Sequence, residues 1–221
     1  MNRDTIAKLE AAHGEDAKWV RMLRMVDESP YDFYEIFHDA YYCSEDSLPF
    51  LAELAGMVET LKPPTTLAGD QNLSAPMVVL GDLRVEGSLR TSSVLVVLGD
   101  LEARIIRDCG PDSQVLVQGN VRAELIWTDG EFHSNGDIEA SALIYGSYND
   151  NVLVGNTIKA PVVVQDDHAM EGDITATHHI AYESQAPLKE VFIEGAFDDE
   201  RGKLDYGVLC DAILAGKDVF R

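Results

Sequence analysis

Apolar and polar residues alternate with a period of two through the middle of the chain, from about residue 76 to residue 182. The recurring unit is an apolar residue, a charged one and a second apolar one, as in Leu83-Arg84-Val85 and Leu101-Glu102-Ala103. Successive side chains of a strand point to opposite faces, so this pattern predicts strands that are buried on one face and exposed on the other. An apolar pair, such as Ile105-Ile106 or Leu143-Ile144, closes most of these segments.

A glycine followed by Asp or Asn marks each segment and reveals a repeat. The six pairs are Gly81-Asp82, Gly99-Asp100, Gly119-Asn120, Gly136-Asp137, Gly155-Asn156 and Gly172-Asp173, at steps of 17 to 20 residues. One repeat is too short to bury its own apolar face, whereas stacked repeats line equivalent residues into the columns of one core. The chain is therefore predicted to be mainly β, with a parallel β-helix (solenoid) of about six rungs of about 18 residues. An antiparallel sandwich would need hairpin turns instead of constant columns.

We interpret the Gly-Asp and Gly-Asn pairs as structural corners of the solenoid rather than as metal ligands. Glycine is expected to supply a turn conformation, often with positive φ, that other residues adopt at a cost. The neighbouring Asp or Asn is expected to hydrogen-bond locally within the turn. Alanine recurs four residues after most of the glycines and predicts a tight column, formed by Ala103, Ala123, Ala140 and Ala176.

The two ends of the chain differ from the repeat. Residues 1–62 are predicted to be a helical N-terminal region that ends at Pro63-Pro64, and residues 63–186 to be the solenoid. Residues 187–221 are predicted to hold one last strand, near 188–193, and a capping helix within 202–216. Open solenoid ends expose unpaired strand edges, so helices at both ends are expected to act as caps. A capped solenoid is poorly suited to end-to-end polymerisation.

Charge is the strongest compositional feature of the chain. Seventeen Lys and Arg against 39 Asp and Glu give a net charge of −22. Such a surface repels nucleic acid and anionic membranes and attracts cationic partners, although acidity also serves solubility alone. The chain has no long apolar run, its charged start is not expected to be a signal peptide, and its three cysteines show no CxxC pairing. We therefore expect a cytoplasmic protein without disulfides that binds neither nucleic acid nor membrane.

Histidines offer the best candidates for chemistry. The Asp166-Asp167-His168 run and His178-His179 lie in neighbouring turns, which leaves open a metal site or an active site there. His168 occupies the column four residues before the glycine, where Met77, Leu95, Val115 and Phe132 also fall, which favours an inward or corner histidine instead. The chain contains no GxGxxG, Walker A or HExxH motif and no nucleophile signature beside a histidine. We therefore expect no enzyme activity and no cofactor.

A partner-binding edge is easier to predict than a pocket. The residues just after the closing apolar pairs mix aromatic and acidic side chains, and stacking places them along one edge of the solenoid. Exposed aromatic residues anchor protein partners, and acids steer cationic ones. The alternative is that these are variable turn residues without a partner. The predicted binding residues are Asp108, Trp127, Asp129, Glu131, Tyr145, Tyr148, Asp150, Asp166, Asp167 and Tyr182.

The rungs MVVLGDLRVEGSL, VLVVLGDLEARII and VLVQGNVRAELI resemble the bactofilins and related polymer-forming bacterial proteins. The resemblance covers residues 76–182, and it implies a β-helix core that self-assembles through its ends. The chain departs from that family in its N-terminal region, its C-terminal helix and its acidity. It is more similar to capped solenoid proteins encoded beside bacterial polymorphic toxins, and its tail KLDYGVLCDAILAGKDVFR is similar to the tails of that group.

Three functions follow as expectations. The first is an immunity protein, without catalysis, that binds and neutralises a basic toxin domain, with a homodimer as an alternative to a monomer. The second is a bactofilin-like scaffold that assembles with copies of itself. The third is a metal-binding protein or enzyme that uses the region from Asp166 to His168 together with His178 and His179.

Overall fold

A computed structural model describes residues 7, 11, 64–74, 77–79, 81–148 and 151–221. The chain divides into two units, Met1–Lys62 and Pro63–Arg221, and the second of these is described below. The predicted helical region 1–62 and the predicted binding residue Asp150 lie outside the described residues, apart from two positions of the former.

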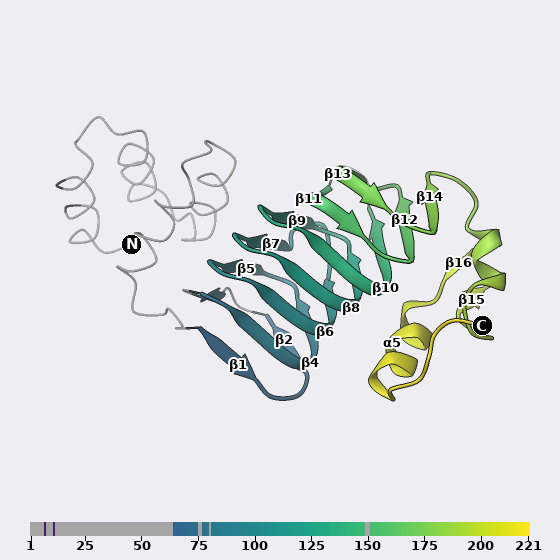
Figure 1. Ribbon diagram of the computed structural model, residues 1–221, viewed down its shortest axis with the longest axis horizontal. Helices are drawn as coiled ribbons and strands as arrows, with labels where there is room; N and C mark the ends of the chain where they lie inside the picture. Colours follow the sequence, from purple (N-terminus) through teal and green to yellow (C-terminus); the bar gives the residue numbers. More distant parts are fainter. Residues whose placement is uncertain (1–6, 8–10, 12–63, 75–76, 80, 149–150) are drawn as a thin grey trace. The chain divides into compact units, whose positions relative to one another are not determined.

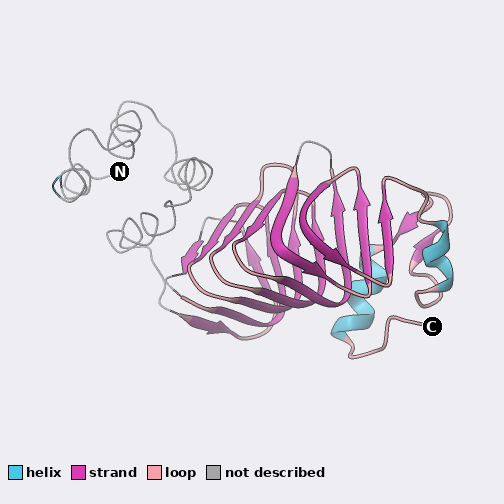
Figure 2. Ribbon diagram, turned by 45° about the horizontal axis from the view of Figure 1, so that its top comes forward, coloured by secondary structure: helices cyan, strands magenta, loops and turns pink. Residues whose placement is uncertain are grey.

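The second unit is a parallel β-solenoid of about six turns, as predicted, and Figures 1 and 2 show its coils stacked side by side. Each full turn contributes strands to three faces. The first face contains β1 (Thr65–Leu67), the starts of β4 (Leu83–Thr91), β6 (Leu101–Asp108), β8 (Val121–Thr128) and β10 (Ile138–Ser147), and the ends of β11 (Val152–Lys159) and β13 (Ala169–Thr175). The second face contains β2 (Gln71–Leu73), the later halves of β4, β6, β8 and β10, then β12 (Val162–Asp166) and β14 (His178–Ala181). The third face contains β3 (Met77–Val79), β5 (Val94–Val97), β7 (Gln114–Val117), β9 (Glu131–Ser134) and the starts of β11 and β13.

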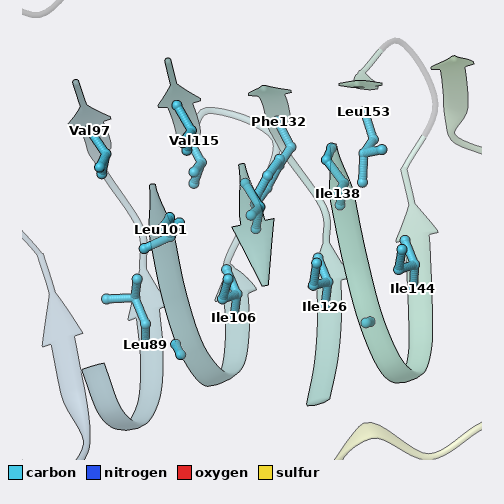
Figure 3. Close-up of a cluster of buried hydrophobic side chains, with 14 of the residues drawn as sticks. Leu89, Val97, Leu101, Ile106, Val115, Ile126, Phe132, Ile138, Ile144 and Leu153 are labelled. Carbon is cyan, nitrogen blue, oxygen red and sulfur yellow. The ribbon is translucent and has the colours of Figure 1, made fainter. Parts of the chain in front are cut away.

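The inward side chains form columns that run through the stack. On the third face Leu95, Val115 and Phe132 are in register and completely buried, and Figure 3 shows members of this face opposite the buried isoleucines of the second face. A strand spacing of about 4.8 Å brings equivalent aliphatic side chains into contact in successive turns. The core is therefore continuous along the solenoid, although no single repeat contains one.

Hydrogen bonds between successive turns hold the corners. The Oδ1 atom of Asp82 accepts a hydrogen bond from the backbone N–H of Asp100 in the next turn, at 2.9 Å, and Asp100 accepts one from Asn120 at 2.8 Å. Asn120 continues the series to Asp137 at 3.1 Å. The expectation of local bonding within one turn is wrong, because these oxygens reach the following turn. The pairs do form structural corners, as predicted.

The glycines of these corners are required for space rather than for positive φ. A Cβ atom on Gly99 would overlap Oδ1 of Asp82, and one on Gly119 would overlap Oδ1 of Asp100. Of the six repeated glycines, only Gly172 has a positive φ, at 144°. The prediction that the repeated glycines supply a left-handed turn is therefore wrong for five of them. Gly99, Gly119 and Gly136 leave room for the side chain that joins one turn to the next, whereas Gly81 and Gly155 leave room for Pro64 and Ile138.

The second face is apolar on its outer side as well, and the C-terminal segment covers it. This segment consists of the 3-10 helix η1 (Ala186–Glu190), the short antiparallel pair β15 (Phe197–Asp198) and β16 (Lys203–Leu204), and the helix α5 (Tyr206–Leu214). Its buried residues form one cluster with outward residues of β6, β8, β10 and β12. The helix begins at Asp205, whose side chain accepts a hydrogen bond from the N–H of Val208.

The C-terminal helix is confirmed, but it does not cap the solenoid. It contacts β6 and β8 on the side of the stack, and Figure 1 shows it alongside the coils. No strand forms near 188–193: η1, which has Pro187 in its first turn, extends to Glu190, and Phe192 makes an isolated antiparallel bridge with Phe220. Among the described strands, β13 pairs only with β11 and β14 only with β12, so the outer edge of the last turn is open.

Candidate partner-binding corner

The structure divides the predicted binding edge into a buried part and an exposed part. Trp127 and Tyr145 are 8% and 1% exposed, and their rings stack with centroids 3.9 Å apart. Tyr206 of α5 contacts Trp127 edge-on at 5.3 Å, and Tyr145 donates a hydrogen bond to Asp166 at 2.7 Å. Their predicted exposure is wrong because the C-terminal segment covers this side of the second face.

Asp108 is also buried, and its predicted role at the surface is wrong. Its carboxylate accepts hydrogen bonds from the hydroxyl of Thr128 at 2.7 Å and from the backbone N–H groups of Asp129 and Gly130 at 2.6 and 3.2 Å. Complete burial raises the pKa of Asp108 to about 7, against the lowering effect of these three hydrogen bonds. Asp108 therefore joins two turns from inside the corner.

The exposed part of the edge lies in the last three turns. Tyr148, Asp167 and Tyr182 are the first residues after β10, β12 and β14, so they occupy equivalent corners. The two tyrosines are 49% and 63% exposed and are the exposed large hydrophobic residues of the described part of the chain. We call these three residues the tyrosine corner.

All three residues of the tyrosine corner have backbone conformations that favour glycine. Their φ angles are 105° for Tyr148, 59° for Asp167 and 57° for Tyr182. They are also the three non-glycine residues with positive φ among those described. Asp adopts this region more readily than most residues, but a bulky residue there costs about 1–2 kcal/mol, so the two tyrosines are a cost that stability alone does not explain. Strain of this kind concentrates at sites that bind ligands.

A buried histidine supports the tyrosine corner from inside. His168 is 1% exposed; its Nδ1 lies 3.1 Å from the carbonyl oxygen of Tyr148, and its own carbonyl accepts a hydrogen bond from the Tyr182 hydroxyl at 3.2 Å. Burial lowers the pKa of His168, which favours the neutral ring. The ring occupies the space where a side chain at Gly146 would lie. The predicted inward position of His168 is confirmed.

Acidic groups flank the tyrosine corner, and most of them already have partners. Asp129 accepts a hydrogen bond from Ser147 at 2.5 Å and lies 3.7 Å from Arg107. Asp166 pairs with Lys203 at 2.7 Å. Glu131, at the start of β9, lies 3.0 Å from the ring of His133. The side chain of Asp167 is exposed.

The residues of the predicted metal or active site lie in different environments. His168 is buried, whereas His178 and His179 are exposed on β14. The Nε2 of His179 lies 2.8 Å from the Oε1 of Gln165. Within the described ranges, no group of three or more His, Cys, Asp or Glu side chains is placed to hold a metal ion.

One surface feature was present in the sequence pattern but was not recognised as a site. The alanine column lines a groove with a volume of about 600 Å³, from Arg122 to Thr177, and the charged residues between the apolar ones form its wall. The sequence showed the alternation of apolar and charged residues, but the charged residues were expected only to face solvent and not to line a groove.

Comparison with known proteins identified no relative of this chain. No family model, curated protein or solved structure matches the chain. In the described part of the chain, no helix is long and apolar enough to cross a membrane.

Proposed function

We propose that this protein is a binding protein without catalysis, and that a basic protein docks on the tyrosine corner. The observation that carries the proposal is the conjunction of two exposed tyrosines and three positive φ angles at equivalent corners of the last three turns. Tyrosine gives a large contact area for little conformational entropy, and it is enriched among the residues that dominate binding energy. The strained corner presents both rings before the partner arrives.

The charge of the chain supports a cationic partner. A net charge of −22 accelerates encounter with a basic surface, and Asp167 adds an exposed carboxylate beside the tyrosines. A basic toxin domain is the partner that the resemblance to solenoids encoded beside toxins implies. In that case neutralisation occurs by covering the active cleft of the toxin, and it needs no reactive group on this chain.

A second candidate is a self-assembling scaffold, and the open edge of the last turn favours it. Met170, Ile174 and Ala176 are partly buried at the end of the core, beside the unpaired edges of β13 and β14. However, β13 carries exposed Glu171 and Asp173, and its pairing with β11 is interrupted between Val154 and Thr157. Edge charges and bulges are devices that oppose strand addition. This edge therefore supports the discrete binding protein better than the scaffold.

The tyrosine corner is tested by capture followed by titration. The tagged full chain is exposed to host-cell extract at low salt, and a basic protein that elutes at high salt is purified and titrated by calorimetry. The test variant is Tyr148→Gly combined with Tyr182→Gly, because glycine accepts both φ angles and leaves the fold intact. We expect its dissociation constant to rise at least about tenfold. Equal affinity for the native chain and this variant would overturn the proposed site.

A matched pair of charge variants separates the corner from the overall acidity. Asp167→Asn removes one charge at the tyrosine corner, and Asp137→Asn removes one at an exposed glycine corner. We expect only Asp167→Asn to slow association, and the slowing to shrink as salt rises. Equal effects of the two variants would mean that the partner responds to net charge alone.

The toxin class is tested in cells. The captured protein is expressed with the native chain or with the Tyr148→Gly/Tyr182→Gly variant, and growth is followed. We expect growth arrest in cells that lack the native chain and rescue only by the native form. A captured protein that is harmless when expressed alone would exclude the toxin class and leave the binding site in place.

A further inference from the structure

The outward residues of the first face, which line the alanine groove and two neighbouring hollows, carry charges of alternating sign from turn to turn. These residues are in register on the first face, in the order Thr66, Arg84, Glu102, Arg122, Glu139, Lys159 and Thr175. We call this row the charge ladder. Five charges alternate in sign, beginning and ending with a cation, and a neutral threonine stands at each end.

The charge ladder is exposed, and the ion pairs that its side chains form within the chain lie at the surface. Its five charged side chains are between 46% and 61% exposed. Arg84 and Glu102 are 3.6 Å apart, and Lys159 contacts Glu139 at 2.5 Å. Arg122 approaches a corner residue, Asp100, at 3.3 Å. Exposed pairs of this kind add about 1 kcal/mol or less to folding, so their charges remain available to a partner.

A second hollow lies beside Arg84, Glu102 and Arg122, and two other charged residues that line it are already engaged. Arg104 contacts Glu124 at 2.6 Å and donates hydrogen bonds to the carbonyl oxygens of Ile213 and Leu214 at the end of α5. In the alanine groove itself, the small residues Ala123, Ala140 and Ala160 form the floor, and the neutral residues Ser141, Pro161 and Thr177 complete the lining. The charge ladder is therefore the wall that another molecule can approach.

We infer that a second copy of this chain binds along the charge ladder in the reverse direction. The row reads the same from either end, so a copy rotated by a two-fold axis perpendicular to the solenoid presents the same alternation. A shift of one turn, about 4.8 Å, places an anion opposite Arg84 and Arg122 in each copy, and Lys159 then lies opposite the neutral Thr66. In that register Arg84 faces Glu139 of the second copy and Glu102 faces its Arg122, and the symmetry repeats each pair. Without the shift, the same arrangement places like charges opposite each other. The charge ladder therefore favours the shifted register.

The occupant is a second copy because its charges are complementary at four of the five charged turns. A uniformly basic or acidic partner would meet a like charge at every other turn, about 9.6 Å apart. The net charge of −22 opposes association of two copies at long range, whereas the ladder itself carries three cations and two anions. Contacts between exposed charges over small side chains give a weak dimer. This dimer does not depend on the proposed binding function, because the tyrosine corner uses other residues.

Ladders of uniform charge test the inference most sharply. A basic chain carries Glu102→Lys and Glu139→Lys, and an acidic chain carries Arg84→Glu, Arg122→Glu and Lys159→Glu. Each alone repels its own copy, whereas a mixture of the two restores opposite charges at the four turns that face each other in the proposed register. Sedimentation at matched concentration measures dimer formation, and circular dichroism monitors the fold. We expect a native dimer, monomers for each variant alone and a heterodimer in the mixture.

A conservative variant protects the test against misfolding. Glu102→Gln with Glu139→Gln keeps the size of both side chains, and we expect it to raise the dissociation constant of the dimer at least about tenfold. The native dimer is expected to weaken as salt rises, because its contacts are exposed charges. A native chain that stays monomeric at low salt and high concentration overturns the inference. A dimer that persists unchanged in the glutamine variant does so as well.

Discussion

Side chains of one chemical type behave differently according to their depth in the corners. Asp100 accepts a hydrogen bond from the backbone N–H of Asn120 near the surface, and this bond lowers the pKa of Asp100. Asp108 accepts comparable bonds from Thr128, Asp129 and Gly130, but complete burial outweighs them and raises its pKa. The ionised carboxylate of Asp100 is therefore stabilised by its hydrogen bond, whereas burial makes the charge of Asp108 costly.

The Asp108→Asn variant should be more stable than the native chain above pH 7. The amide keeps an acceptor for the N–H groups of Asp129 and Gly130, and its NH₂ group donates to the Thr128 hydroxyl, which also bonds to the carbonyl of Gly130. The folded pKa of about 7 exceeds the reference value of 3.8, so the native state binds more protons between these values. The native chain therefore loses stability as pH rises from about 4 to 7, at about 1.4 kcal/mol per unit.

Urea unfolding of both proteins from pH 4 to pH 9 measures this effect. The difference in unfolding free energy should grow up to about pH 7 and then stay constant, since both states of the native chain are ionised above that pH. Other carboxylates are common to the two proteins and cancel in the difference. Two parallel pH profiles would show that Asp108 titrates normally.

The Gly99→Ala variant should lose at least about 2 kcal/mol of unfolding free energy. The added methyl group overlaps Oδ1 of Asp82 and forces apart the bond to the N–H of Asp100. Gly207→Ala, near the start of α5, is the control, because its nearest neighbour is 3.2 Å away and alanine favours a helix. Thermal unfolding of both variants distinguishes the two cases. A Gly99→Ala protein as stable as the control would refute the spatial role of the glycine.

The repeat of the glycines could be recognised from the sequence, but the physical reason for a glycine at each corner could not. The spacing of the glycines located the corners, because stacking forces the same residue to recur in every turn. A glycine required by positive φ and one required by a neighbouring side chain leave the same trace in one sequence. The strained conformations of Tyr148 and Tyr182 left no trace at all, since both residues are ordinary in a strand or a loop.

The second face shows at the level of an element why the aromatic prediction failed. Ile105 and Ile106 are adjacent, and adjacent residues of a strand point to opposite sides, so both sides of this face are apolar. Trp127 lies two residues after Leu125 and therefore shares its side, as Tyr145 shares that of Leu143. The apolar pairs were thus the available signal that another layer covers this face. The covering layer itself, residues 185–220, joins the outward side chains in one cluster.

The Leu209→Ala variant tests that layer. Leu209 is completely buried in the cluster between α5 and the second face, so its truncation should cost about 2–4 kcal/mol. Asp211→Ala, on the exposed side of the same helix, should change stability by less than about 0.5 kcal/mol. Chemical denaturation compares the two variants. If Leu209→Ala proved as mild as its control, α5 would be an appendage rather than a covering layer.

The whole molecule combines an open end with features that oppose growth from it. The helices expected as caps led to the conclusion that the solenoid does not polymerise, but α5 lies on its side. Protection of the end comes instead from Glu171 and Asp173 on β13 and from the irregular pairing of β11 with β13. Two separate surfaces remain for partners, the tyrosine corner for a basic protein and the charge ladder for a second copy. Periodicity alone predicted the solenoid, whereas these surfaces needed side-chain placement.

Light scattering after size-exclusion chromatography, over a range of concentrations and salt, tests the central claim that this is a discrete binding protein. We expect a species no larger than a dimer at every concentration, with the dimer fraction falling as salt rises. A monomer throughout would remove the charge ladder contact and leave the binding protein intact. Assemblies that keep growing with concentration would contradict the account, because they would show that the edge of β13 and β14 accepts further copies and that the protein is a scaffold.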